Sequence, residues 1–129
     1  MEGLPVTIID VVRPEDMPQI YALGDLVVIP SRFEEPFSMV AIEAMASGVP
    51  VLALRKGGMA AYMVHGQNAL VIDAGSSAVQ LGDAIRHAAQ DGAQLAAIAD
   101  NACHMVRASY TWERVAAQTE ALYDQVSQN

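Results

Sequence analysis

Two short segments carry residue types that could bind a charged, hydroxyl-rich ligand. Glu34 and Glu35 lie in a loop between apolar stretches, and Ser38 stands where a helical pattern begins. With Ser38 as the N-cap, the free amides and the positive dipole end of that helix form an anion site that suits phosphate. Glu43 follows among apolar neighbours, where an ionised carboxylate needs a partner such as ligand hydroxyls. Acidic residues at a helix start can also stabilise the helix dipole without binding any ligand, so the spacing of these residues leaves both interpretations open.

The second segment is a short run of two cations and two glycines, Arg55-Lys56-Gly57-Gly58. Both segments follow an expected strand and precede a helix, and open parallel sheets bind ligands beyond the carboxyl ends of their strands. Three cations near these ends could contact phosphate: Arg32, Arg55 and Lys56. The alternative interpretation is that these cations are solvated loop residues without a ligand. The glycines match neither a Walker loop nor a dinucleotide fingerprint.

The elements that must position these segments alternate along the chain. Short apolar runs predict strands over 6–9, 26–29, 49–54 and 69–72. Helical patterns occupy 14–23, 38–47 and 59–64, and three further helices follow over 76–90, 92–107 and 111–126. This order predicts an α/β fold, a Rossmann-like parallel sheet of about four strands flanked by helices, with a helical C-terminal segment. Trp112 is expected to anchor the last helix on the domain.

Composition narrows the class of protein. The chain has 129 residues, enough for one domain, and 53% of them are hydrophobic. A net charge of −8 without clustered cations argues against nucleic acid and anionic membranes as partners. The lone Cys103 excludes an internal disulfide and a Cys-rich zinc site. Neither a secretory signal nor a transmembrane-length apolar run is visible, so we expect a cytoplasmic protein.

The exact string of residues 30–51, PSRFEEPFSMVAIEAMASGVPV, adds a family resemblance. It closely resembles the signature of retaining glycosyltransferases of family 4, in which two Glu are separated by seven residues, as Glu35 and Glu43 are. In that signature Ala-Met-Ala, a small residue, Gly, a variable residue and Pro follow. Nearly the whole chain shares the resemblance, including the segments 16–26, 57–58, 65–68 and 110–114.

The resemblance implies a fold, a reaction and a set of contacts. Such enzymes have two Rossmann-like domains facing a cleft, the GT-B fold, and the second domain binds a nucleotide-sugar donor. They transfer a sugar, here of hexose type, to an acceptor hydroxyl with retention of anomeric configuration and without a required metal or other cofactor. Glu35 would organise the donor sugar, and Glu43 would accept from the ribose hydroxyls. The donor-binding set implied is Glu35, Pro36, Phe37, Ser38, Met39 and Glu43, with Glu35 as the catalytic residue.

Departures from the family pattern affect which donor could be bound. Ser38 and Ala69 replace frequent glycines, Asp10 stands where Gly is frequent, and Ala60-Ala61 replaces a common Pro-Glu. The family's acceptor-binding first domain has no counterpart, and neither have the first two strand-helix units of the second domain, which carry its phosphate-binding cations. Residues 1–129 are therefore interpreted as a single, truncated C-terminal donor-binding domain, inactive by itself.

The truncation affects the expected sheet. In the usual strand order the strands over 6–9 and 26–29 are not neighbours, because a missing strand lies between them. We expect direct pairing of these two strands, or a homo-oligomer formed through the exposed sheet edge.

Two other classes of protein remain as alternatives. A degenerate interaction module would keep the fold without the chemistry. A receiver-like domain needs an Asp after the third strand, which residues 52–54 do not supply.

Overall fold

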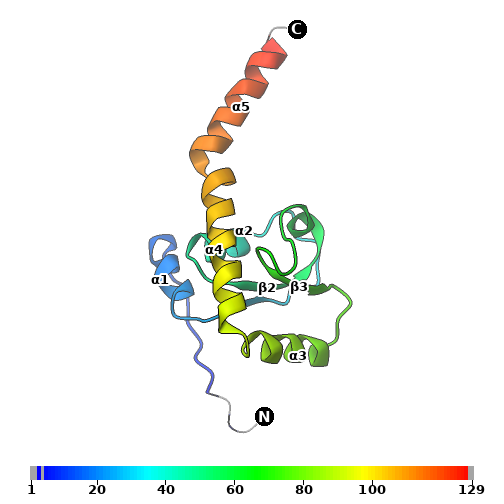
Figure 1. Ribbon diagram of the computed structural model, residues 1–129. Coiled ribbons are helices and arrows are strands. Elements are labelled where there is room, and N and C mark those ends of the chain that lie inside the picture. Colours follow the sequence, from blue (N-terminus) through cyan, green and yellow to red (C-terminus); the bar gives the residue numbers. More distant parts are fainter. Residues whose placement is uncertain (1–2, 4, 128–129) are drawn as a thin grey trace.

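A three-stranded parallel sheet forms the centre of the computed structural model, which describes residues 3 and 5–127 (Figure 1). The strands lie in the order β1–β2–β3, with bounds Val27–Ile29, Val51–Arg55 and Leu70–Asp73. Val27 pairs with Val51, and Leu52 pairs with Leu70. The α/β class and the parallel sheet predicted from the sequence are confirmed, but the sheet has three strands rather than about four.

The expected strand over residues 6–9 is the one that does not form. This segment belongs to no strand, and the side chains of Val6 and Ile8 are 77% and 90% exposed. β-branched residues favour an extended backbone, but a strand also needs a neighbour that accepts and donates its hydrogen bonds. Direct pairing of this segment with β1 is therefore wrong for the described residues, and β1 pairs there on one side alone.

The helices lie within a few residues of their expected positions. Their bounds are η1 Pro14–Asp16, α1 Met17–Tyr21, α2 Met39–Ala46, η2 Gly57–Ala61, α3 Ala78–Ala88, α4 Gly92–Ser109 and α5 Trp112–Ser127, where η marks a 3-10 helix. Polar caps set several of the starts. Ser77 and Gln80 form a reciprocal capping box at α3, and Thr111 Oγ1 accepts from the amide of Arg114 at 3.4 Å at α5.

Both faces of the sheet are covered, which explains the continuous apolar runs in its strands. One face packs Val51 and Ala53 against buried residues of α2, η2 and the second half of α4. The other face packs Leu52 against α3 and the first half of α4, which contributes Ile98. The loops at the carboxyl ends of β1 and β2 are thereby held on a rigid base.

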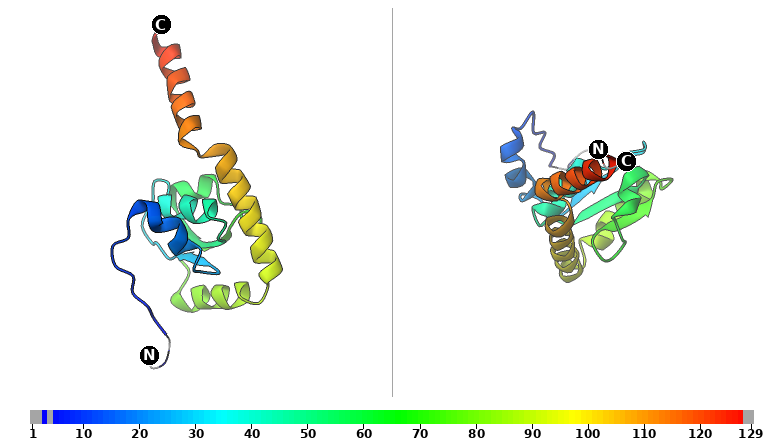
Figure 2. Two further views of the ribbon diagram at one scale, coloured as in Figure 1. Left: turned by 90° about the vertical axis from the view of Figure 1, so that its left-hand side faces the viewer. Right: turned by 90° about the horizontal axis from the view of Figure 1, so that it is seen from above.

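The last helix lies outside this core. Helix α5 has no buried residue and extends past the body from the end of α4 (Figures 1 and 2). Trp112 is 79% exposed, so the expectation that it anchors the helix is wrong. The helical conformation is interrupted at Tyr110 and Thr111, and α5 then extends away from the sheet. Among residues 3 and 5–127, no helix is long and apolar enough to cross a membrane.

A buried amide provides the first test of this packing. Asn68 accepts from the Val64 amide at 2.7 Å and donates to the Tyr62 carbonyl at 2.8 Å, just before β3. Replacing Asn68 with Ala leaves these backbone groups without their partner. We expect the free energy of unfolding to fall by about 2 kcal/mol in urea denaturation. The exposed neighbour Gln67→Ala is the control, and equal values for the two variants would contradict the assignment.

Candidate functional site

The loop between β1 and α2 ends in an unusual backbone conformation. Ser38 has φ 65° and ψ 85°, a left-handed conformation that a residue with a β-carbon adopts at a cost. It occupies the N-cap position expected from the sequence, but its side chain makes no capping hydrogen bond, and its buried Oγ has no partner. The amides at the start of α2 therefore lack side-chain capping, as an anion-binding helix end requires.

Two glycines hold the loop by direct backbone contact. The amide of Gly58 donates to the carbonyl of Glu35 at 2.8 Å. A β-carbon on Gly57 would collide with the backbone of Glu35, and one on Gly58 would collide with Pro36. Gly57 also has φ 59°, which favours glycine. The two segments singled out in the sequence are therefore packed together, and these glycines permit that approach.

An aromatic cluster packs against the same loop. The rings of Phe37, Tyr62 and Tyr110 lie 5.3 to 5.8 Å apart between centroids, in tilted arrangements. Tyr62 donates its hydroxyl to the carbonyl of Phe37 at 2.7 Å. Burial, the nearby Glu35 carboxylate and Tyr110 raise the pKa of Tyr62, so its hydroxyl keeps its proton as a donor. The cluster fixes the backbone at Phe37, directly after Pro36.

Glu43 is held by a partner that the sequence did not reveal. Tyr21 of α1 donates to Glu43 Oε2 at 2.9 Å, and burial together with this carboxylate raises the pKa of Tyr21 to about 12. Both side chains line a cavity of about 460 Å³ between α1, α2 and α4, which Arg107 also lines. Because Tyr21 bonds one carboxylate oxygen, the other can accept from a ligand.

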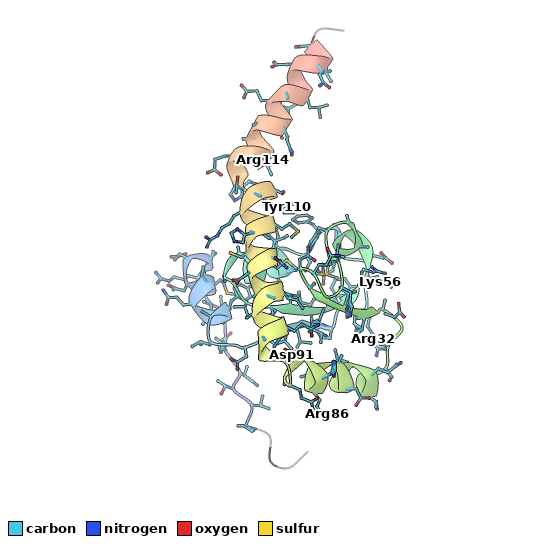
Figure 3. The ribbon with its side chains drawn as sticks, viewed as in Figure 1. Arg32, Lys56, Arg86, Asp91, Tyr110 and Arg114 are labelled. Atoms are coloured by element: carbon cyan, nitrogen blue, oxygen red, sulfur yellow. The ribbon has the colours of Figure 1, made fainter. Side chains whose placement is uncertain are left out.

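Two of the predicted phosphate contacts, Arg32 and Lys56, lie close together at the ends of neighbouring loops (Figure 3). Lys56 donates to the carbonyl of Arg32 at 2.9 Å and pairs with Glu34 at 3.7 Å, while Arg32 reaches the carbonyl of Ser76 at 3.3 Å. These contacts brace the loop ends. Arg55 lines a surface cavity of about 350 Å³ with His65 and Ser76, among others.

The structure therefore unites part of the predicted set. Residues 35–37 lie against Gly57 and Gly58, whereas Glu43 lines its cavity without Glu35 among the lining residues. Sequence reasoning missed four side chains that position or border the site, namely Tyr21, Tyr62, Arg107 and Tyr110. Tyr21 and Tyr62 occupied apolar positions of predicted helices, and only their hydroxyl hydrogen bonds distinguish them, whereas Tyr110 lay between two predicted helices. Within the described residues, no three His, Cys, Asp or Glu side chains gather as a metal site would need.

These features define a class: a Rossmann-like α/β domain with its candidate site beyond the carboxyl ends of the parallel strands. The sequence family described as "Glycosyl transferases group 1" matches residues 2–91. The chain belongs to this glycosyltransferase family.

Individual relatives agree with that assignment. The chain is 37% identical over 107 residues to the lipopolysaccharide 1,2-N-acetylglucosaminetransferase of Salmonella typhimurium, a match that covers 83% of this chain and 28% of the relative. A sucrose-phosphate synthase structure from Thermosynechococcus elongatus superposes with a TM-score of 0.87 at 32% identity, covering 95% of this chain and 30% of that one. Anabaena HepE in complex with UDP-glucose matches with a TM-score of 0.75 and 32% identity, covering 88% and 30%.

The matched region is a fraction of each relative. The chain spans between 25% and 32% of the length of the first four curated relatives. The family assignment therefore holds for this region.

Substituting Gly58 tests the backbone contact that holds the site. In Gly58→Ala the new β-carbon meets the Pro36 carbonyl, so we expect the free energy of unfolding to fall by about 2–3 kcal/mol. Gly75→Ala is the matched control, because open space surrounds a β-carbon there. Thermal denaturation of both variants checks this, and a Gly58→Ala melting temperature equal to that of the control would refute the contact.

Alkaline titration tests the Tyr21–Glu43 pair. The pKa of Tyr21 is raised from 10.0 to about 12, so the folded chain keeps this proton where the unfolded chain loses it. Its contribution to stability is full below pH 10 and is lost as the pH rises toward 12. Phenolate absorbance of the wild type minus Tyr21→Phe should titrate near pH 12, with circular dichroism confirming the fold. A difference curve centred near pH 10 would contradict the pairing.

Proposed function

We propose that this chain is the donor-binding portion of a retaining glycosyltransferase of family 4 with the GT-B fold. It binds a nucleotide-diphosphate sugar, and the whole enzyme transfers a hexose-type sugar to an acceptor hydroxyl. One observation carries the proposal: residues 35–37 are packed on Gly57 and Gly58, just before the uncapped start of α2 at Ser38. Family membership and the HepE complex with UDP-glucose support it.

In this proposal each part of the loop has a role. Glu35 orients the hydroxyls of the donor sugar as the catalytic residue, acting as an organiser rather than a nucleophile. The backbone of Pro36 to Met39 lies beside the sugar or diphosphate, and the α2 dipole stabilises the negative charge. Glu43 accepts from the ribose hydroxyls, in the carboxylate position that Tyr21 fixes.

In this proposal the cations contribute less to binding of the diphosphate than the start of α2 does. Arg32 and Lys56 are engaged with the loop backbone, so their first role is to brace it. A guanidinium has five N–H donors, and Arg32 and Arg55 can direct remaining ones to a phosphate. The leaving phosphate accepts the proton of the acceptor hydroxyl while that oxygen bonds to the anomeric carbon on the same face, which retains the configuration. No metal is part of this mechanism.

The remainder of the enzyme is a required partner in this proposal. An acceptor-binding domain closes the cleft, and the 129-residue chain alone binds donor without completing transfer. The edge of β1 that is unpaired in the described residues could accept a strand from that remainder or from a second copy, as expected from the sequence. The cytoplasmic location stays a prediction.

Calorimetric titration with UDP-glucose tests the donor site, followed by GDP- and ADP-sugars. We expect weak binding, with a dissociation constant of about 0.1–1 mM, because the chain spans between 25% and 32% of the length of the first four curated relatives. Glu43→Gln removes the charged acceptor for the ribose and should weaken binding by about tenfold or more. The control Glu120→Gln removes an identical charge on the exposed helix α5 and should bind as the wild type does.

Two outcomes would refute the assignment. Wild type that binds none of the three nucleotide sugars at millimolar concentration would favour the alternative, an interaction module that kept the fold alone. Equal affinity of Glu43→Gln and wild type would show that Glu43 does not contact the donor.

A further inference from the structure

Ser38 combines two unusual features at the start of α2. Its Oγ is the one buried side-chain polar atom without a hydrogen-bond partner among residues 3 and 5–127, and the residue is 8% exposed. Ser38 is also the one non-glycine residue with a positive φ in that part of the chain. An unpartnered buried hydroxyl and a left-handed backbone each reduce stability. Such strain persists only where the surrounding structure maintains it, and it clusters at ligand-binding sites.

A second serine shows the geometry of an ordinary cap in the same chain. Ser77, at the start of α3, has an extended backbone with φ −73° and ψ 164°, and its Oγ accepts from the Gln80 amide at 3.3 Å. This is the usual geometry of a serine N-cap. Ser38 is the same residue type at the same helix position, but with φ 65° it makes no such bond. The backbone therefore keeps the Ser38 hydroxyl from capping α2.

Contacts of the preceding residues hold Ser38 in this conformation. Tyr62 donates its hydroxyl to the Phe37 carbonyl at 2.7 Å, and the Gly58 amide donates to the Glu35 carbonyl at 2.8 Å. Both bonds fix the chain just before Ser38, and neither involves its side chain. The loop therefore maintains a hydroxyl that the folded chain does not use for its own hydrogen bonding.

The start of α2 beside this hydroxyl is suited to an anion. The amides of Met39, Val40 and Ala41 precede the first bond of the helix, which runs from the Ile42 amide to the Ser38 carbonyl at 3.4 Å. Met39 and Val40 are 52% and 49% exposed, so this turn lies at the surface. A serine hydroxyl changes direction by rotation about χ1 alone. A hydroxyl that turns toward the helix end can donate to an anion that the amides also bind.

We propose that the Ser38 hydroxyl donates to a phosphate oxygen of the bound nucleotide-diphosphate sugar. This inference rests on the proposed function and adds a side-chain hydroxyl to the phosphate contacts of that site. The hydroxyl has no partner in the free chain, and binding supplies one. Glycine, which is frequent at this position of the family pattern, adopts the left-handed conformation without strain but has no hydroxyl. Loss of this hydroxyl should therefore have opposite effects on stability and on affinity.

Paired measurements of melting temperature and of affinity for UDP and UDP-glucose test the contact with the full chain. Ser38→Ala removes the hydroxyl and keeps the β-carbon. We expect its melting temperature without ligand to rise by about 2–5 °C, because an unsatisfied buried group is lost. Its dissociation constants for UDP and UDP-glucose should both rise by about tenfold, because a hydrogen bond to a charged group is lost.

Ser77→Ala is the matched control, because it removes the same hydroxyl from a serine that does cap its helix. We expect its melting temperature to fall by about 2–5 °C and both dissociation constants to stay at the wild-type values. Melting temperatures that fall in both variants would show that the Ser38 hydroxyl has a partner in the free chain, which overturns the proposal.

The binding data separate this contact from the donor site itself. Equal affinities of Ser38→Ala and the wild type overturn the contact and leave the donor site in place. A loss confined to UDP-glucose places the hydroxyl on the sugar and overturns the assignment to phosphate. Wild type that binds neither ligand at millimolar concentration refutes the donor site, and the contact with it.

Discussion

Close backbone contact between two loops is the constraint on which the candidate site depends. Gly57 and Gly58 lie against the main chain of Glu35 and Pro36 at a separation that leaves no room for a β-carbon. This contact unites the loops that follow β1 and β2, and it holds the chain as it enters α2 through the left-handed Ser38. Without it, the carbonyl of Glu35 would lose the hydrogen bond from the Gly58 amide, and the Tyr62 contact at Phe37 would remain to hold the loop.

Buried tyrosines convert this backbone frame into a site with defined chemistry. Tyr62 ties the loop to the core through the Phe37 carbonyl, and Tyr21 fixes the carboxylate of Glu43. Both hydroxyls act as donors because burial and a nearby carboxylate raise their pKa values. Glu43 therefore faces a neutral donor rather than a second ion, which leaves its carboxylate charge available to ligand hydroxyls.

Much of the fold could be predicted from the sequence because local patterns determine it. Apolar runs at β2 and β3 and the helical patterns over 76–90 and 111–126 placed the elements within a few residues. Contacts between residues that are distant in the sequence were harder to predict. Residues 6–9 have the composition of a strand without a strand beside them, and Trp112 has the size of a core residue without a surface to cover it. The pairing of Tyr21 with Glu43 left no signal in spacing, since only the folded packing of α1 on α2 creates it.

The central claim is that the loop before α2 binds the donor, and NMR amide shifts report on it most directly. Titration of the isotope-labelled chain with UDP-glucose should move the amides of Glu35, Phe37, Ser38 and Met39 together with that of Glu43, while those of α3 and α5 stay in place. Shifts confined to α3, α5 or the surface cavity at Arg55, with the loop amides unmoved, would contradict the account.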